Sequence, residues 1–143
     1  MMKMLILCLS ICGLLIASSS SRAPAADEPA VAAASKAADS WLKLIDDGKY
    51  SESWTQTSAF FQKRVQQTQW TEQASAARDP LGSLTSRKLA GAHYTTSLPG
   101  APDGRYVVLQ YKSSFANKQS AVETVIPMRE ADGQWRVSGY YIR

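Results

Sequence analysis

Two side chains of this sequence could act as a general base, and the first is a histidine. His93 is the only histidine of the chain; it lies beside Tyr94 and shares a strand face with Leu89, Gly91 and Thr95. An imidazole titrates near neutral pH, so His93 would serve as a base if that face lined a pocket. The alternative is a strand histidine that faces solvent, because the sequence offers it no identifiable carboxylate partner.

The second candidate is Glu123, a carboxylate within the nearly apolar run 121–126. If it is buried it needs a cation, and Arg78 and Arg87 are available at the junction between the helical and the strand-rich parts of the chain. We expect such an Arg–Glu pair to be architectural rather than catalytic. The exposed face of the same strand is the other place that Glu123 could occupy.

Several common catalytic signatures are missing. The sequence has no Gly-x-Ser-x-Gly elbow, no glycine-rich phosphate loop and no Asp/Glu cluster at metal-ligand spacing. We therefore assign no catalytic residue, no metal and no cofactor. The side chains that we expect at a ligand site are Trp54, Arg78, His93, Tyr111 and Glu123.

Three helices are predicted ahead of the strands, because apolar residues recur there at spacings of three and four. The first begins near residue 33 and stops at Asp47-Gly48, where glycine supplies the left-handed residue that commonly follows a helix. The second carries Tyr50, Trp54, Thr57 and Phe61. The third begins near residue 68 and ends in the Pro-Gly stretch at 78–82.

The period then changes to two, which indicates strands at 87–98, 105–115, 121–128 and 134–143. Short loops join them, and Asp132-Gly133 is a strong hairpin signal. The fold class is therefore α+β, with three N-terminal helices packed on one face of a four-stranded antiparallel sheet. In the last strand the alternation sends Tyr140 and Tyr141 to opposite faces, so one of them should lie at the surface, where it could help a partner to dock.

The N-terminus is typical of a cleavable signal peptide over residues 1–25. Lys3 precedes the uncharged run 5–17, and small residues lead to cleavage after Ala25 or Ala26. A membrane anchor is the alternative, but this run is shorter than the roughly 20 apolar residues that span a bilayer. We expect a flexible lead-in at 26–32, one domain at 33–143, and a periplasmic or secreted location without a stable membrane anchor.

The two cysteines, Cys8 and Cys12, lie in this leader, so the mature domain would fold without disulfides. The leader also contains Lys3 and Arg22, so the mature chain is less basic than the net charge of +4 for the whole sequence. It has no clustered Lys/Arg footprint, which argues against nucleic acid as a partner.

Several short segments, in this order and spacing, resemble the DUF4019 family of bacterial exported proteins. They are Trp41-Leu42, Asp47-Gly48-Lys49-Tyr50, Ser53-Trp54, Arg78-Asp79-Pro80-Leu81-Gly82, the stretch 98–106 and the final stretch 132–140. The resemblance covers essentially the whole mature chain. It implies a helices-then-sheet layout similar to the NTF2-like, cystatin-type fold, in which a curved sheet wraps a long helix and can leave a pocket; it implies no particular function.

We therefore expect a non-enzymatic exported domain that binds a small apolar ligand or a periplasmic protein through the concave side of its sheet. The alternative is an NTF2-like isomerase or lyase for a small organic molecule, with His93 or Glu123 as the base. An enzyme needs a titratable group inside a pocket beside a second polar group, whereas a binding protein needs only an apolar cavity.

Overall fold

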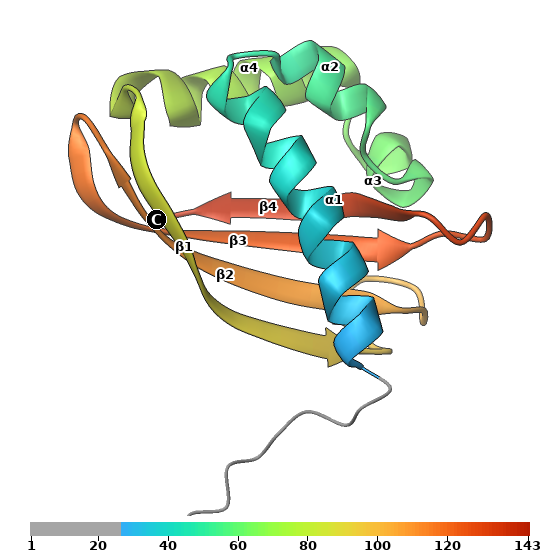
Figure 1. Ribbon diagram of the computed structural model, residues 1–143. Helices are drawn as coiled ribbons and strands as arrows, with labels where there is room; N and C mark the ends of the chain where they lie inside the picture. The colour runs from blue at the N-terminus through green and yellow to red at the C-terminus, as the bar shows by residue number, and fades with distance from the viewer. Residues whose placement is uncertain (1–26) are drawn as a thin grey trace, which may run out of the picture.

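The computed structural model describes residues 27–143, which form helices followed by one four-stranded antiparallel sheet (Figure 1). The expected signal peptide, with both cysteines, lies outside the described residues. No helix within the described part is long and apolar enough to cross a membrane. The elements are α1 (Glu28–Asp46), α2 (Tyr50–Thr55), α3 (Ala59–Arg64), α4 (Gln67–Arg78), the short 3-10 helix η1 (Asp79–Leu81), β1 (Leu84–Thr95), β2 (Tyr106–Phe115), β3 (Lys118–Arg129) and β4 (Trp135–Ile142).

Helix α1 begins at Glu28, about one turn earlier than the sequence pattern predicts, so most of the expected lead-in at 26–32 is helical. Pro29 lies in the first turn, where its fixed φ suits a helix and its missing N–H costs nothing. The alanines that follow have the highest helix propensity of any residue. Gly48, with φ of +72°, ends this helix as predicted.

The single helix predicted around Trp54 and Phe61 is in fact two short helices, α2 and α3. Between them, Thr57 forms a parallel bridge with Val137 of β4, and the Ser58 amide donates a 2.8 Å hydrogen bond to the Val137 carbonyl. The Ser58 hydroxyl then accepts a hydrogen bond from the Phe61 amide and caps α3. The helix is interrupted here because Thr57 and Ser58 pair with β4 instead of continuing the helical hydrogen bonds.

The third predicted helix is α4, and it stops where proline predicts. The η1 turn follows, and Gly82 has φ of +73°, a conformation that turns the chain into β1.

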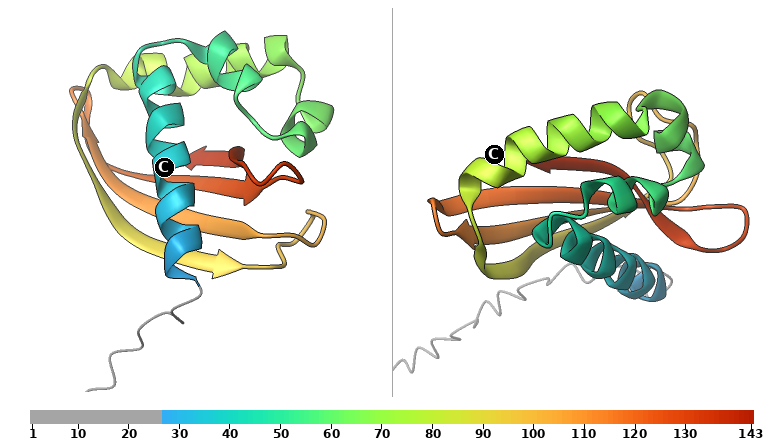
Figure 2. Two further views of the ribbon diagram at one scale, coloured as in Figure 1. Left: turned by 45° about the vertical axis from the view of Figure 1, so that its right-hand side comes forward. Right: turned by 90° about the horizontal axis from the view of Figure 1, so that it is seen from above.

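The sheet has the order β1-β2-β3-β4, so β1 and β4 are its edges. It curves around α1, which lies across its concave face (Figure 2). On the opposite face, the loop 96–104 folds back over Tyr106, whose hydroxyl donates to the Pro102 carbonyl. The antiparallel, four-stranded α+β prediction is thus confirmed, although the first strand begins at Leu84 rather than Arg87.

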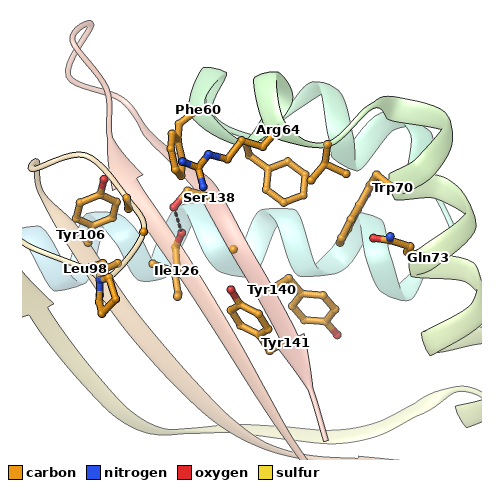
Figure 3. A pocket seen from close by; sticks show the side chains of 16 residues that line it. Phe60, Arg64, Trp70, Gln73, Leu98, Tyr106, Ile126, Ser138, Tyr140 and Tyr141 are labelled. Carbon is orange, nitrogen blue, oxygen red and sulfur yellow. Dashed lines mark hydrogen bonds between the residues drawn. The ribbon is translucent and has the colours of Figure 1, made fainter.

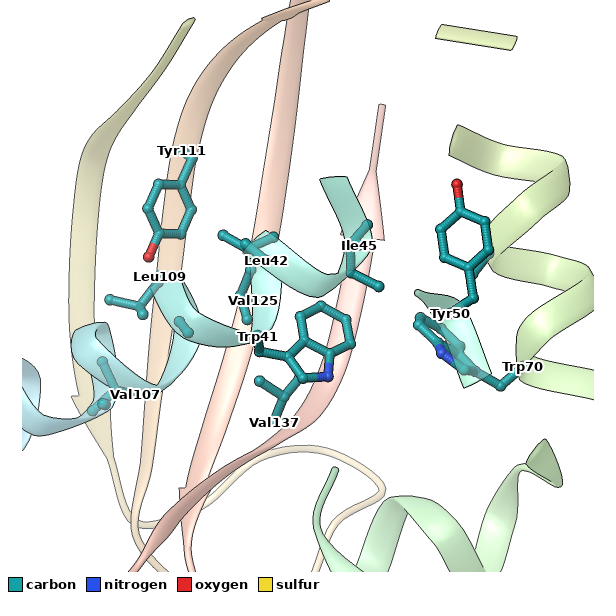
Figure 4. Close-up of a cluster of buried hydrophobic side chains, with 13 residues drawn as sticks. Trp41, Leu42, Ile45, Tyr50, Trp70, Val107, Leu109, Tyr111, Val125 and Val137 are labelled. Atoms are coloured by element: carbon teal, nitrogen blue, oxygen red, sulfur yellow. The ribbon is translucent and has the colours of Figure 1, made fainter. Parts of the chain in front are cut away.

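The core lies between α1 and the concave face of the sheet (Figure 4). Trp41, Leu42 and Ile45 of α1 are almost fully buried. Each large apolar side chain removed from water contributes about 1.5–3 kcal/mol. The strand residues in this cluster are Val107, Leu109, Tyr111, Val125 and Val137. The concave face is therefore filled with side chains along α1.

Candidate functional site

A groove lined by aromatic side chains lies at the β4 edge of the sheet, and we call it the edge groove (Figure 3). Its volume is about 490 Å³, within the roughly 300–1,000 Å³ range of small-molecule sites. The helices α3 and α4 form one wall, and the loop 96–104 with the outer face of the sheet forms the other. Its aromatic lining residues are Phe60, Phe61, Trp70, Tyr106, Tyr140 and Tyr141.

The wall on the helix side is a rigid stack of rings. Trp70 lies 5.4 Å from Phe61, edge to face, and 6.4 Å from Tyr140, measured between ring centroids. Trp41, in the core, contacts both Trp70 and Tyr140 at 5.8 and 5.3 Å. Such pairs stabilise by about 0.5–1.5 kcal/mol beyond their burial, so this wall keeps its shape.

Polar anchors hold the same wall in place. The Trp70 indole N–H donates a 2.9 Å hydrogen bond to the Ser53 hydroxyl. The Trp54 indole N–H donates to the carbonyl of Val65, which lines the groove, at 2.8 Å. Trp54 therefore supports the wall through its hydrogen bond to Val65 and does not itself line the groove.

The groove has one charged side chain among its 16 lining residues, Arg64 at the end of α3. Its guanidinium lies 4.4 Å above the centre of the Phe60 ring and forms no ion pair with any residue that the structure describes. No carboxylate is found in the lining. The groove thus offers six aromatic rings, polar side chains such as Gln73 and Ser138, and a single positive charge.

A second polar feature lies inside the fold. Asp46, Arg78, Arg87 and Glu123, here called the charge cluster, join α1, the end of α4, β1 and β3. Arg87 is bidentate to Asp46, with N–O distances of 2.7 and 2.9 Å, and its Nε donates to Glu123 at 2.7 Å. Arg78 reaches Asp46 at 3.3 Å and stacks on Phe115. Glu123 is completely buried.

Both oxygens of Glu123 are occupied. The Ser113 hydroxyl donates to Oε1 at 2.6 Å, and the Tyr140 hydroxyl donates to Oε2. Burial, together with this carboxylate, raises the pKa of Tyr140. Although burial alone would lower it, hydrogen bonds to Asp46 and Glu123 raise the pKa of Arg87. Arg87 therefore stays charged and Tyr140 stays protonated, as expected beside a buried carboxylate in a structural ion pair.

The sequence-predicted site residues thus fall into three places. Arg78 and Glu123 belong to the charge cluster, and Tyr111 is buried nearby, with its hydroxyl 3.2 Å from Asp39. Trp54 supports the groove wall. His93 lies exposed on edge strand β1, beside Val108, on the face away from the core. None of the five lines the edge groove. The concave face of the sheet, where we expected a ligand to bind, is covered by α1.

The groove residues that sequence reasoning missed come from five separate segments: the α3–α4 region, the loop 96–104, β2, β3 and β4. One signal pointed to them. The adjacent pair Tyr140-Tyr141 required one exposed ring, and Tyr141 is 64% exposed while Tyr140 packs inside. Within residues 27–143, no group of three or more histidine or acidic side chains is placed to hold a metal ion.

The sequence was compared with known proteins. No match was found among curated proteins or among solved structures. One family model, described as a protein of unknown function, DUF4019, matches residues 37–140, which run from the middle of α1 to Tyr140, near the end of β4. Because this match covers well over half of the chain, the protein belongs to the DUF4019 family.

Proposed function

We propose that this protein is an exported, NTF2-like binding domain that takes up a small apolar ligand or an apolar segment of a protein partner in the edge groove and carries out no chemistry on it. The observation that carries the proposal is the groove itself: about 490 Å³ of space lined by six aromatic side chains beside a single cation. Aromatic lining with few polar groups is the usual character of a ligand site.

Export is proposed from the signal-peptide pattern of residues 1–25. The NTF2-like assignment is proposed from the resemblance of the chain, together with a curved antiparallel sheet wrapped around a long helix (Figure 2). That fold serves binding proteins and enzymes alike, so it leaves the function to the groove.

The isomerase or lyase alternative has less support. Of its two candidate bases, His93 is exposed on the outer face of β1, and Glu123 is held by Arg87, Ser113 and Tyr140. Neither residue lines the groove. A general base must reach the substrate proton, and nothing in this geometry lets a groove ligand reach either of them.

The test uses a glycine on the floor of the groove. A Cβ on Gly139 would meet Ile126 and Tyr141 at 3.5 Å, ordinary contact, so the backbone accepts a side chain here, and we expect an added ring to occupy the groove that Gly139 lines. We expect wild type to bind the neutral fluorescent probe phenylnaphthylamine and Gly139→Phe to bind it at least tenfold more weakly.

The matched control is Gly91→Phe, on β1, where a Cβ would meet nothing within 4 Å. It adds the same ring to the same sheet, away from the groove, and should bind the probe like wild type. Equal binding by wild type, Gly139→Phe and Gly91→Phe, or no binding at all, would contradict the proposed site.

A further inference from the structure

The outer edge of β4 is paired at one position only within the described residues. That position is Val137, which bridges to Thr57 and accepts a hydrogen bond from the Ser58 amide. Beyond it, residues 138–142 have β3 on one side and no strand on the other. An unpaired edge presents free N–H and C=O groups to any chain that can lie beside it.

The register shows which main-chain groups point outward. Val122 and Arg143 exchange both of their hydrogen bonds, at 2.8 and 3.1 Å. Because such pairs alternate with non-bonded pairs along an antiparallel ladder, Ile142 and Tyr140 direct their N–H and C=O groups away from β3. A bulge in β4, where Ser138 and Gly139 face Ile126, separates these two residues from Val137.

The edge groove surrounds this free edge on both faces of the sheet (Figure 3). Phe61, Val65 and Trp70 line the helix side, where Tyr140 also packs. Leu98 and Tyr106 line the opposite side. Successive side chains of an extended strand point to opposite faces, so a strand laid along β4 would place alternate side chains against the two apolar walls.

This arrangement distinguishes between two kinds of occupant. A small apolar molecule seated here would cover the outward groups of Tyr140 without bonding them, and an unbonded buried main-chain group costs free energy. A peptide strand would hydrogen-bond the same groups while filling both walls. The adjoining segment of the chain, Thr57-Ser58, already pairs with β4 in this way.

The charge of the groove indicates which side chains a bound strand should carry. Arg64 is exposed at its rim, and neither wall carries an acid. A carboxylate on the bound strand would therefore meet a cation that no described residue neutralises, whereas a basic side chain there would be repelled.

We propose that the edge groove binds an extended peptide segment of a partner protein, which adds as a strand to the outer edge of β4 and carries an acidic side chain opposite Arg64. This inference rests on the proposed function, because it names the occupant of the same groove. Recognition then comes from main-chain hydrogen bonds for affinity and from the two walls for side-chain preference.

The experiment begins with a phage-displayed library of random linear dodecapeptides, panned on the full protein and counter-selected on Gly139→Phe. Selected peptides are expected to alternate apolar residues and to contain an acid. Each is then made with single N-methyl groups along its backbone. We expect N-methylation to weaken binding by about tenfold at every second position, where an N–H bonds to β4, and much less between them.

A pair of variants tests the protein side of the same bonds. Ile142→Pro removes an outward N–H and takes no bond from the β3–β4 ladder, which edge strands tolerate. Ile142→Ala keeps the N–H and removes the side chain, so it is the matched control. We expect the selected peptides to bind Ile142→Pro about tenfold more weakly than Ile142→Ala, with both variants folded by circular dichroism.

Equal binding to the two variants, N-methyl effects without a period of two, or a library without any binder that Gly139→Phe excludes would each overturn the strand proposal. These outcomes are separable from failure of the groove. If phenylnaphthylamine still binds wild type and is excluded by Gly139→Phe, the groove binds ligands but not strands. If the probe and the peptides both bind Gly139→Phe as tightly as wild type, the proposed function is contradicted as well.

Discussion

Arg87 and Arg64 lie in two regions of the molecule that differ in whether a positive charge is paired with carboxylates. Arg87 lies between α1 and the sheet, is 12% exposed, and bonds two carboxylates with three of its nitrogens. Arg64 lies at the rim of the edge groove, stacks on Phe60 and has no ionic partner among the described residues. A buried cation must be compensated within the fold, whereas a rim cation can keep its charge for a ligand.

The two regions also differ in how they are tied to the rest of the fold. The charge cluster links α1, the end of α4, β1 and β3 through ion pairs, and Tyr140 extends it to β4. The groove is walled partly by α3, a helix of six residues, and by the loop 96–104. We infer that the charge cluster ties the layers of the scaffold together, whereas the groove depends on ring contacts and hydrogen bonds among short segments.

The largest expected effect is on the cluster. Arg87→Met retains most of the side-chain volume but leaves Glu123 and Asp46 without their main cation. Removing one partner of a buried pair costs about 3–5 kcal/mol, because a charge stays buried and uncompensated. The free energy of unfolding, measured by urea denaturation at neutral pH, should fall by that amount.

Peptide affinity of the folded Arg87→Met variant should change little, since Arg87 lies outside the groove. A loss of stability below about 1 kcal/mol would show that the cluster is not the tie between α1 and the sheet.

The second effect is a partial recovery. Adding Glu123→Leu to Arg87→Met removes the orphaned carboxylate, and apolar replacement of a whole buried pair is often neutral. The double variant should therefore be more stable than Arg87→Met alone, although Asp46 remains and Tyr140 loses its acceptor.

A double-mutant cycle with both single variants, again in urea, gives the coupling between the two side chains. Strictly additive losses would mean that Arg87 and Glu123 act independently, which contradicts the observed 2.7 Å contact.

A smaller, pH-dependent effect is expected beside the cluster. Tyr50 donates a 2.6 Å hydrogen bond to Asp79, and burial followed by this bond raises the pKa of Tyr50 from 10.0 to about 12. The folded state therefore holds this proton more tightly than the unfolded state, so the stabilisation is complete below pH 10 and is lost as the pH rises towards 12.

Tyr50→Phe lacks this proton and should cost about 1 kcal/mol at neutral pH. The difference in unfolding free energy between wild type and Tyr50→Phe should shrink in a urea series from about pH 9 upward. A difference that stays constant to pH 12 would show that the hydrogen bond to Asp79 contributes nothing to stability.

The sequence predicts the layers of this fold well because they depend on local periodicity. Alternation in 105–115 locates β2 to within one residue, and the proline and glycine after Arg78 locate the end of α4. The break between α2 and α3 was not predictable in this way, since Thr57 leaves the helix to pair with Val137, 80 positions away. Helix propensity depends on neighbouring residues only, so it does not reveal pairing with a residue so distant in the sequence.

The candidate site shows the same limit. The sequence predicts that Glu123, if buried, needs Arg78 or Arg87, and leaves an exposed position open; in the structure it is buried and Arg87 binds it. The edge groove is assembled from residues between Phe60 and Tyr141 that have no common spacing, and its position depends on which strand is the edge. Only the paired tyrosines at 140 and 141 hinted at it.

The smallest effect is expected at the other arginine. Arg64→Met keeps an apolar stem over Phe60 and removes the charge, and exposed substitutions of this kind usually change stability by less than about 0.5 kcal/mol. Peptides with an acidic residue opposite this position should bind Arg64→Met two- to fivefold more weakly than wild type, because exposed ion pairs contribute about 0.2–1 kcal/mol. The difference should be larger at low salt, where such pairs are less screened. Replacing the peptide acid by its amide should abolish the difference between wild type and Arg64→Met, as measured by fluorescence polarisation. If the amide peptide still distinguishes the two proteins, Arg64 acts through its contact with Phe60 and not through its charge. That result would contradict the preference for an acidic side chain but not the addition of a strand to β4.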